Sequence, residues 1–178
     1  MDSKILLTEK KIQQTVKQLA EKINDDISPK TVFIGINSKG TVLAQRLAHL
    51  LNKKYQKVCP VGSLDTSLYQ HDKDEKYITV GQTHLPFSLA NKHVIFVIEC
   101  LKTGRFIKAG LNALMDYDEP LKMDIATLID QDCLSYPIIA KYIGDTFSVY
   151  DHGHIQVNFL EIDGEDVVKT VEKATHLA

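Results

Sequence analysis

The chain has 178 residues, 44% of them hydrophobic, and carries 21 lysines and arginines against 23 aspartates and glutamates. This length and hydrophobic content fit a core that is covered on both faces, so we expect a single domain over residues 1–178. The formal net charge of −2 excludes a strongly basic protein and does not favour a dedicated nucleic-acid binder.

The cysteines and the N-terminal residues indicate the cellular compartment in which we expect the protein. Cys59, Cys100 and Cys133 are odd in number and widely spaced, which favours neither a disulfide framework nor a zinc site. No apolar signal segment follows Met1, and no apolar run is long enough to cross a bilayer. We therefore expect a cytoplasmic protein with no membrane partner.

The first segments alternate between helix and strand patterns. Apolar residues from Ile12 to Ile27 recur at three- and four-residue steps and predict a helix that Thr8 could cap and Pro29 ends. The apolar, β-branched run 32–36 is typical of a strand covered on both faces. A polar turn at 37–40 and a helical stripe from residue 42 to 51 follow, so strand, turn and helix succeed one another.

The same succession recurs later in the chain. Residues 58–69 have strand character and lead into the charged stretch 70–76, which predicts an exposed, mobile loop. A second buried strand begins at 94–97 and precedes a helical stripe at 107–115. Further strands are expected at 125–129, 140–143 and 155–160. This alternation predicts an α/β fold with a mostly parallel sheet flanked by helices on both faces.

Two turns of the predicted sheet could hold an anion. Residues 102–105 combine a threonine, a glycine and two cations at the start of a helix, which is a phosphate-cradle composition. Gly104 could equally serve only a tight strand-to-helix turn. The Ser-Lys-Gly turn at 38–40 allows the same two interpretations. Since each turn follows a buried strand, both belong at the sheet edge where parallel α/β folds bind ligands.

Four segments together resemble a known family. Residues 35–40, 61–69, 94–104 and 130–144 are similar, in order and spacing, to segments of the PyrR family of pyrimidine operon attenuation regulators and uracil phosphoribosyltransferases. The resemblance spans about residues 5–165. It implies the type I phosphoribosyltransferase fold, with a small hood and a flexible loop, and a phosphoribosyl ligand: a nucleoside monophosphate or phosphoribosyl pyrophosphate (PRPP).

The resemblance also implies roles for individual residues. Glu99 would be the catalytic acid that holds the ribose, and Mg²⁺ would be the cofactor if the protein is active. The phosphate-binding residues would be Lys102, Thr103, Gly104, Arg105 and Phe106. The pyrophosphate-binding residues would be Ser38, Lys39 and Gly40, and the base side would hold Asp130, Tyr136 and Pro137.

The chain departs from the family pattern at several of these places. Ile98 stands where the family has a second acid beside Glu99, and Phe106 stands where it has a threonine. Arginines of the mobile loop and of the base-side segment are also missing. Because phosphoribosyl transfer depends on fixed carboxylates, Mg²⁺ and basic groups, we expect phosphoribosyl binding with weak or lost catalysis. The first alternative is an active enzyme that makes UMP and pyrophosphate from uracil and PRPP.

The remaining expectations concern partners and metals. The second alternative is an RNA-binding pyrimidine regulator, which the missing arginines and the acidic balance do not support. The family resemblance implies a homodimer or higher homo-oligomer. The Asp-His-Gly-His stretch at 151–154 invites a metal site, but two histidines without further ligands are more typical of a solvated turn. We therefore expect no protein-bound metal site.

Overall fold

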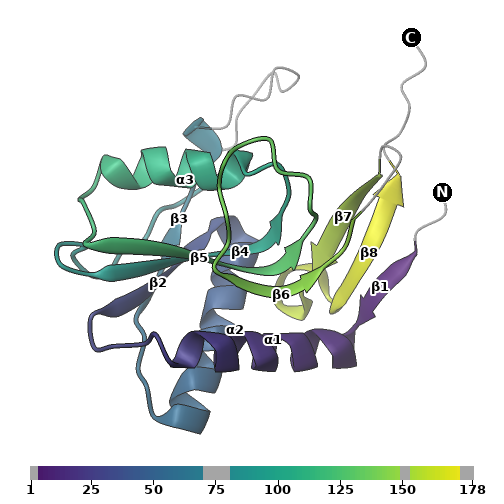
Figure 1. The fold of residues 1–178 in the computed structure, drawn as a ribbon, viewed down its shortest axis with the longest axis horizontal. Helices are drawn as coiled ribbons and strands as arrows, with labels where there is room; N and C mark the ends of the chain where they lie inside the picture. Colours follow the sequence, from purple (N-terminus) through teal and green to yellow (C-terminus); the bar gives the residue numbers. More distant parts are fainter. Residues whose placement is uncertain (1–3, 70–80, 149–152, 173–178) are drawn as a thin grey trace.

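The computed structural model describes residues 4–69, 81–148 and 153–172, which form two sheets and their flanking helices (Figure 1). The larger sheet has the strand order β3-β2-β4-β5-β6, and all its neighbouring strands are parallel. Its strands are β2 (Thr31–Ile36), β3 (Val61–Leu64), β4 (His93–Leu101), β5 (Lys122–Asp130) and β6 (Tyr142–Thr146).

Helices cover both faces of this sheet. In Figure 1, α1 (Glu9–Asn24) and α2 (Asn37–Tyr55) lie below it and α3 (Arg105–Met115) lies above. Alternate residues of β4 explain the two layers: Ile95 and Val97 pack in the cluster with α1 and α2, while Phe96 and Ile98 pack in the cluster with α3. The expected mostly parallel sheet with helices on both faces is thus confirmed.

A second, antiparallel sheet forms a small hood at one end of the domain. It has the order β1-β8-β7, with β1 (Ile5–Thr8), β7 (Gly153–Asn158) and β8 (Val167–Glu172). Between β7 and β8 lies the one-turn helix α4 (Leu160–Asp163). We call β1, β7, β8 and α4 the hood. Sequence patterns did not predict β1 or β8, whereas the strand expected at 155–160 corresponds to β7.

Several boundaries differ from the expected ones. The polar residues 37–40 form the first turn of α2, so this helix begins at Asn37 and not after the turn. Thr8 is the N-cap residue of α1, but its side chain makes no capping hydrogen bond. Helix α1 ends at Asn24, five residues before Pro29. Of the stretch 58–69, only β3 and a 3₁₀ turn (Ser67–Tyr69) are regular.

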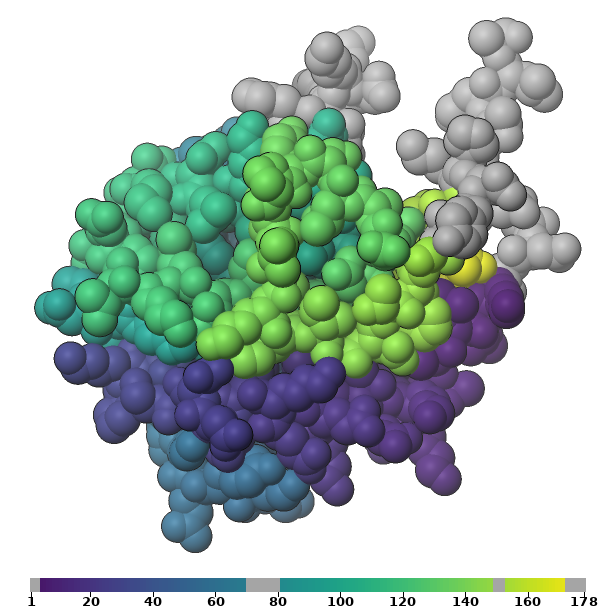
Figure 2. All heavy atoms as spheres, viewed as in Figure 1, coloured from purple at the N-terminus to yellow at the C-terminus, as the bar shows by residue number. Residues whose placement is uncertain are grey.

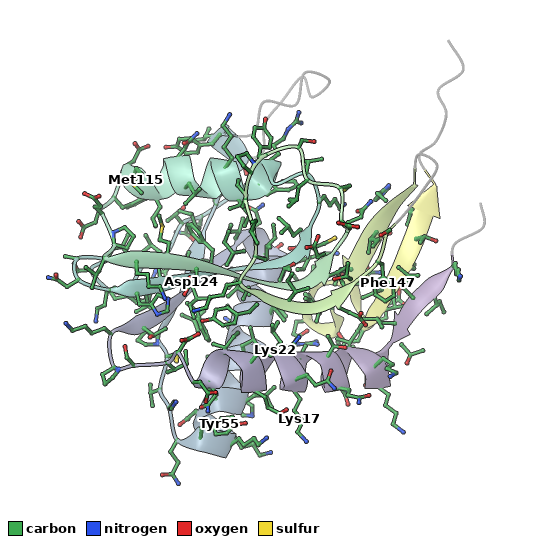
Figure 3. The ribbon with its side chains drawn as sticks, viewed as in Figure 1. Lys17, Lys22, Tyr55, Met115, Asp124 and Phe147 are labelled. Carbon is green, nitrogen blue, oxygen red and sulfur yellow. The ribbon has the colours of Figure 1, made fainter. Side chains whose placement is uncertain are left out.

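Side-chain contacts join α1 to the far edge of the sheet and the strands to one another. Lys22 of α1 donates a hydrogen bond from Nζ to the Ile143 carbonyl of β6, at 2.7 Å. Asp124 of β5 pairs with His93 at 2.8 Å and with Lys122 at 2.9 Å, at the amino ends of the strands; Figure 3 labels Lys22 and Asp124. These contacts lie away from the carboxyl ends, where the predicted site lies.

Two expectations fall at the limits of the described chain. The expected mobile loop at 70–76 and the residues Asp151 and His152 lie outside the described residues. Within the part of the chain that the structure describes, no helix is long and apolar enough to span a bilayer.

Candidate functional site

The two predicted anion-binding turns meet at one cavity of about 210 Å³. Lys39 of α2, together with Glu99 and Lys102 at the end of β4, lines this cavity from the side of the large sheet. Hood residues 154–157 of β7 line it from the other side. The fold therefore brings Lys39 together with two predicted site residues, Glu99 and Lys102, that follow it by 60 and 63 positions in the sequence.

Lys39 is already bound by the hood. Its Nζ donates a hydrogen bond to the Val157 carbonyl at 2.6 Å and approaches Asn158 Oδ1 at 3.4 Å. It also forms an ion pair with Asp163 Oδ2 at 3.0 Å. Lys39, which was predicted to bind pyrophosphate, thus joins α2 to β7 and α4.

Ser38 and Gly40, the other two residues of the predicted pyrophosphate turn, do not line this cavity. Ser38 is exposed and lines a second cavity of about 510 Å³ beside β3, together with Ser63, Asp65 and Ser67. Gly40 is buried, and a Cβ there would come within 2.4 Å of the Val97 carbonyl oxygen. Gly40 is therefore required for the close approach of α2 to β4, whatever its part in ligand binding.

Asn37, which no sequence pattern singled out as a site residue, shapes this turn. Its backbone is left-handed, with φ of 55°, and its Oδ1 accepts hydrogen bonds from the backbone and hydroxyl of Thr66, each at 3.1 Å. Thr41 Oγ1 donates to the Asn37 carbonyl at 2.7 Å. Asparagine tolerates this conformation better than most residues, so an asparagine directly after a buried strand was the available signal.

No sequence pattern singled out Asp65 as a site residue either. Its carboxylate accepts hydrogen bonds from Ser67 Oγ at 2.7 Å and from the Gly81 amide at 3.0 Å. The bond from Gly81 joins the two described segments on either side of residues 70–80. Only the fold brings Gly81 close to Asp65, so no local spacing indicates this contact.

Glu99 lines the smaller cavity, whereas its neighbour Ile98 packs in the hydrophobic core. Burial raises the pKa of the Glu99 carboxyl above its usual 4.5, and this effect exceeds the opposing effects of a backbone hydrogen bond and of the charges of Lys102 and Lys39. The Ile98 side chain is only 4% exposed and packs among apolar residues between the sheet and α3. Position 98 therefore belongs to the core in this chain.

The predicted phosphate-binding turn opens α3. Gly104 is its N-cap residue, with φ of 84°, a conformation that favours glycine. Thr103, Arg105 and Phe106 are exposed, and the Arg105 amide donates to Thr103 Oγ1 at 3.4 Å. These features fit an accessible helix start at which a backbone amide group could meet an anion.

The base-side segment lies against this turn. In Figures 1 and 2 the chain between β5 and β6 arches toward the start of α3. The Ser135 amide donates to the Thr103 carbonyl at 3.0 Å, and a Cβ at Gly104 would lie 3.5 Å from Tyr136 Cβ. The Tyr136 ring faces Lys108, whose Nζ is 5.0 Å from the ring centroid.

The other two base-side residues sit around this arch. Asp130 ends β5, and its Oδ1 accepts a hydrogen bond from the Asp132 amide at 2.9 Å. Pro137 is exposed. The fold thus brings the base-side segment to the predicted phosphate turn.

The residues present do not fit a protein-held Mg²⁺. Among the described residues, no group of three or more histidines, cysteines, aspartates and glutamates is placed to hold a metal. Glu99 is the one carboxylate among the described residues that line the smaller cavity, and its raised pKa disfavours the ionised form. Mg²⁺ needs several oxygen ligands, so a bound Mg²⁺ would depend on oxygens from the ligand and from water.

Comparisons with known proteins agree with this geometry. Residues 2–161 match the family model described as the phosphoribosyl transferase domain. The bifunctional protein PyrR of Syntrophobacter fumaroxidans is 33% identical over 176 residues, which cover 97% of this chain and 94% of that protein. The bifunctional protein PyrR of Ligilactobacillus salivarius is 36% identical over 142 residues, covering 78% of this chain and 80% of that protein.

Solved structures share the fold at lower identity. A hypoxanthine phosphoribosyltransferase from Staphylococcus aureus superposes with a TM-score of 0.70 at 22% identity, covering 95% of this chain and 91% of that one. The hypoxanthine phosphoribosyltransferase of Trypanosoma cruzi also gives 0.70, at 16% identity, with 95% and 96% covered. At these identities the likeness establishes the fold, including the parallel sheet and the hood.

Proposed function

Because the chain belongs to the phosphoribosyl transferase domain family, with PyrR proteins among its relatives, we propose that it binds a phosphoribosyl ligand but transfers the group weakly or not at all. The ligand is a nucleoside monophosphate or PRPP. Glu99 and Lys102 contact it from the end of β4, and the turn at 103–106 holds its 5′-phosphate.

The burial of Ile98 carries this proposal. The side chain is 4% exposed within the α3-side core, at the position where the resemblance places one of two ribose-holding acids. An isoleucine cannot accept a hydrogen bond from a ribose hydroxyl or orient a Mg²⁺ shell. Glu99 then remains as the single acid of the pair, with a raised pKa. A hydrogen bond to a charged group contributes about 1.5–3 kcal/mol, so its loss weakens both binding and transfer.

Phosphoribosyl transfer also needs stabilisation of the departing pyrophosphate. Positive charge develops on the ribose and negative charge on the leaving group, so fixed cations and Mg²⁺ lower the barrier. Lys39, the cation of the predicted pyrophosphate turn, is bound by the hood at 2.6 Å and 3.0 Å. Mg²⁺ would enter with PRPP, held by the ligand's own oxygens.

Two measurements on the purified protein test the proposal. Isothermal titration with UMP and with Mg²⁺-PRPP measures binding, and a uracil-dependent assay for pyrophosphate release measures transfer. We expect UMP to bind and pyrophosphate release to be slow or undetectable. Absence of binding for both ligands would refute a phosphoribosyl site, while turnover at ordinary enzyme rates would refute weakened catalysis.

One observation favours the active enzyme as a second candidate. Lys39, Glu99 and Lys102 line the same cavity, so one acidic and two basic side chains are available despite Ile98. In that case the protein makes UMP and pyrophosphate from uracil and Mg²⁺-PRPP, and the same assay detects it. The expected homo-oligomer remains a prediction that sedimentation velocity can check.

A further inference from the structure

Asp163 of α4 holds the cation of the predicted pyrophosphate turn. The Asp163 and Lys39 side chains are 21% and 24% exposed, and their charged atoms lie 3.0 Å apart. Asp163 Oδ2 also accepts a hydrogen bond from the Phe159 amide at 2.9 Å. Because the backbone fixes this carboxylate, its place beside Lys39 does not depend on the ion pair.

A pyrophosphoryl group would have to compete with Asp163 for Lys39. The ammonium group has three donors, and Val157, Asn158 and Asp163 approach it. A ligand phosphate at Lys39 must displace at least one of them. Asp163 also places a negative charge near the cavity: burial is the main cause of the raised pKa of Glu99, and the charge of Asp163 adds to it.

Lys102 lines the same cavity as Lys39 but, unlike Lys39, is not paired with Asp163. It forms no ion pair with any residue of the described chain, and it lies directly before the predicted phosphate-binding turn. One phosphate can therefore be neutralised without disturbing the hood. Among the described residues that line this cavity, Lys39 is the only other lysine or arginine, and it is paired with Asp163, so a second phosphate meets no unpaired lysine or arginine there.

The neighbouring cavity beside Ser38 supplies no substitute for Lys39. The described residues that line it carry hydroxyl, amide and apolar side chains and one carboxylate, that of Asp65. A highly charged anion placed there would meet this carboxylate and none of the cations among the described residues. Charge neutralisation in this part of the site thus depends on Lys39.

From these contacts we propose that Asp163 is a positioning residue that sets the ligand class: by retaining Lys39 at the hood, it makes the site take a phosphomonoester in preference to a pyrophosphoryl ligand. The inference rests on the proposed function, because it concerns the same site. It adds that the preference is encoded in the Lys39–Asp163 pair, and that one isosteric change weakens it.

The test compares dissociation constants for UMP and for inorganic pyrophosphate, measured by isothermal titration. Asp163→Asn keeps an oxygen that can accept from the Phe159 amide but removes the charge that holds Lys39. We expect this variant to bind pyrophosphate roughly tenfold more tightly, the strength of one charge-assisted hydrogen bond. We expect UMP affinity to change much less. Glu161→Gln is the matched control, since it removes one charge from α4 at a residue that pairs with Arg46 and not with Lys39.

A double-mutant cycle with Lys39→Met distinguishes the effect of the Lys39–Asp163 pair from the effect of the overall charge of the site. In the Lys39→Met background, Asp163→Asn should no longer tighten pyrophosphate binding, because the released partner is absent. If Asp163→Asn tightens binding equally in both backgrounds, or not at all, the inference is wrong although UMP binding stands. If wild-type protein does not bind UMP, the proposed function itself fails. Should Asp163→Asn not fold, Asp163→Ser takes its place in the cycle.

Discussion

Ile98 and Phe106 are the residues at which the phosphoribosyl site departs most directly from the family pattern. Phe106 is 37% exposed in the first turn of α3, whereas Ile98 is 4% exposed in the core. We expect the double variant Ile98→Asp with Phe106→Thr to bind Mg²⁺-PRPP more than tenfold more tightly, because it restores two polar contacts. Burying the new carboxylate should lower the free energy of unfolding by about 2 kcal/mol or more.

Titration calorimetry and urea denaturation measure these two effects. Phe106→Thr alone is the control, since its exposed position should leave stability within about 0.5 kcal/mol of the wild type. An unchanged affinity in the double variant would mean that the site has diverged beyond these positions.

Gly104 is the residue on which the phosphate-binding turn depends. Its φ of 84° is strained for any side chain, most of all a β-branched one. We expect Gly104→Val to abolish UMP binding, because the backbone can no longer hold the turn open for a phosphate. Gly164→Val is the matched control: it has a φ of 77° with no atom within 4 Å of the added Cβ.

Both glycine variants should lose a similar stability, about 1–2 kcal/mol from strain alone, as thermal denaturation would measure. Only the variant at position 104 should lose UMP affinity in titration calorimetry. Retained affinity at Gly104→Val would remove the turn from the candidate site.

At the scale of elements, α4 is fastened to α2 by Arg46. Its guanidinium forms ion pairs with Glu161 at 2.5 Å and with Asp166 at 2.8 Å, and it stacks on the Phe159 ring at 4.8 Å. We expect Arg46→Met to lower the free energy of unfolding by about 3 kcal/mol, since the largely buried Asp166 carboxylate loses its partner. Lys54→Met, which breaks the exposed pair with Glu21, should lower the free energy of unfolding far less, because water screens an exposed ion pair. Equal losses in urea denaturation would contradict this ranking.

The sequence predicted those elements whose signal is local. The strands at 32–36 and 94–97 were predictable because buried parallel strands are continuous apolar runs. Strands β1 and β8 were not, because β1 has only four residues, β8 has no continuous apolar run, and their pairing joins the distant residues Ile5 and Lys169. The start of α2 was missed because Asn37, Ser38 and Gly40 have low helix propensity, which the packing of α2 on the sheet overrides.

The candidate site was predictable to the same extent. Its two turns could be located because each follows a buried strand, and parallel strands end at one edge. The contact of Lys39 with Asp163 could not, because 123 other residues separate the two in the chain and only the hood brings them together. The role of Gly40 was also hidden, since its close approach to Val97 is a property of the packed sheet and helix.

At the scale of the whole molecule, the hood and the large sheet share one core. Leu7 of β1 and Val157 of β7 belong to the same buried cluster as Ile12 of α1 and Leu43 of α2. A shared core predicts one cooperative unfolding transition. Leu7→Ala should therefore lower the stability of the entire domain by about 2–4 kcal/mol, and amide exchange in β4 and β8 should accelerate together.

Ile5→Ala on the same strand, where the side chain is 58% exposed, should change stability by less than about 1 kcal/mol. If β8 alone exchanged faster in Leu7→Ala while β4 kept its protection, the hood would unfold as a separate unit, and the Lys39 contacts would open with it.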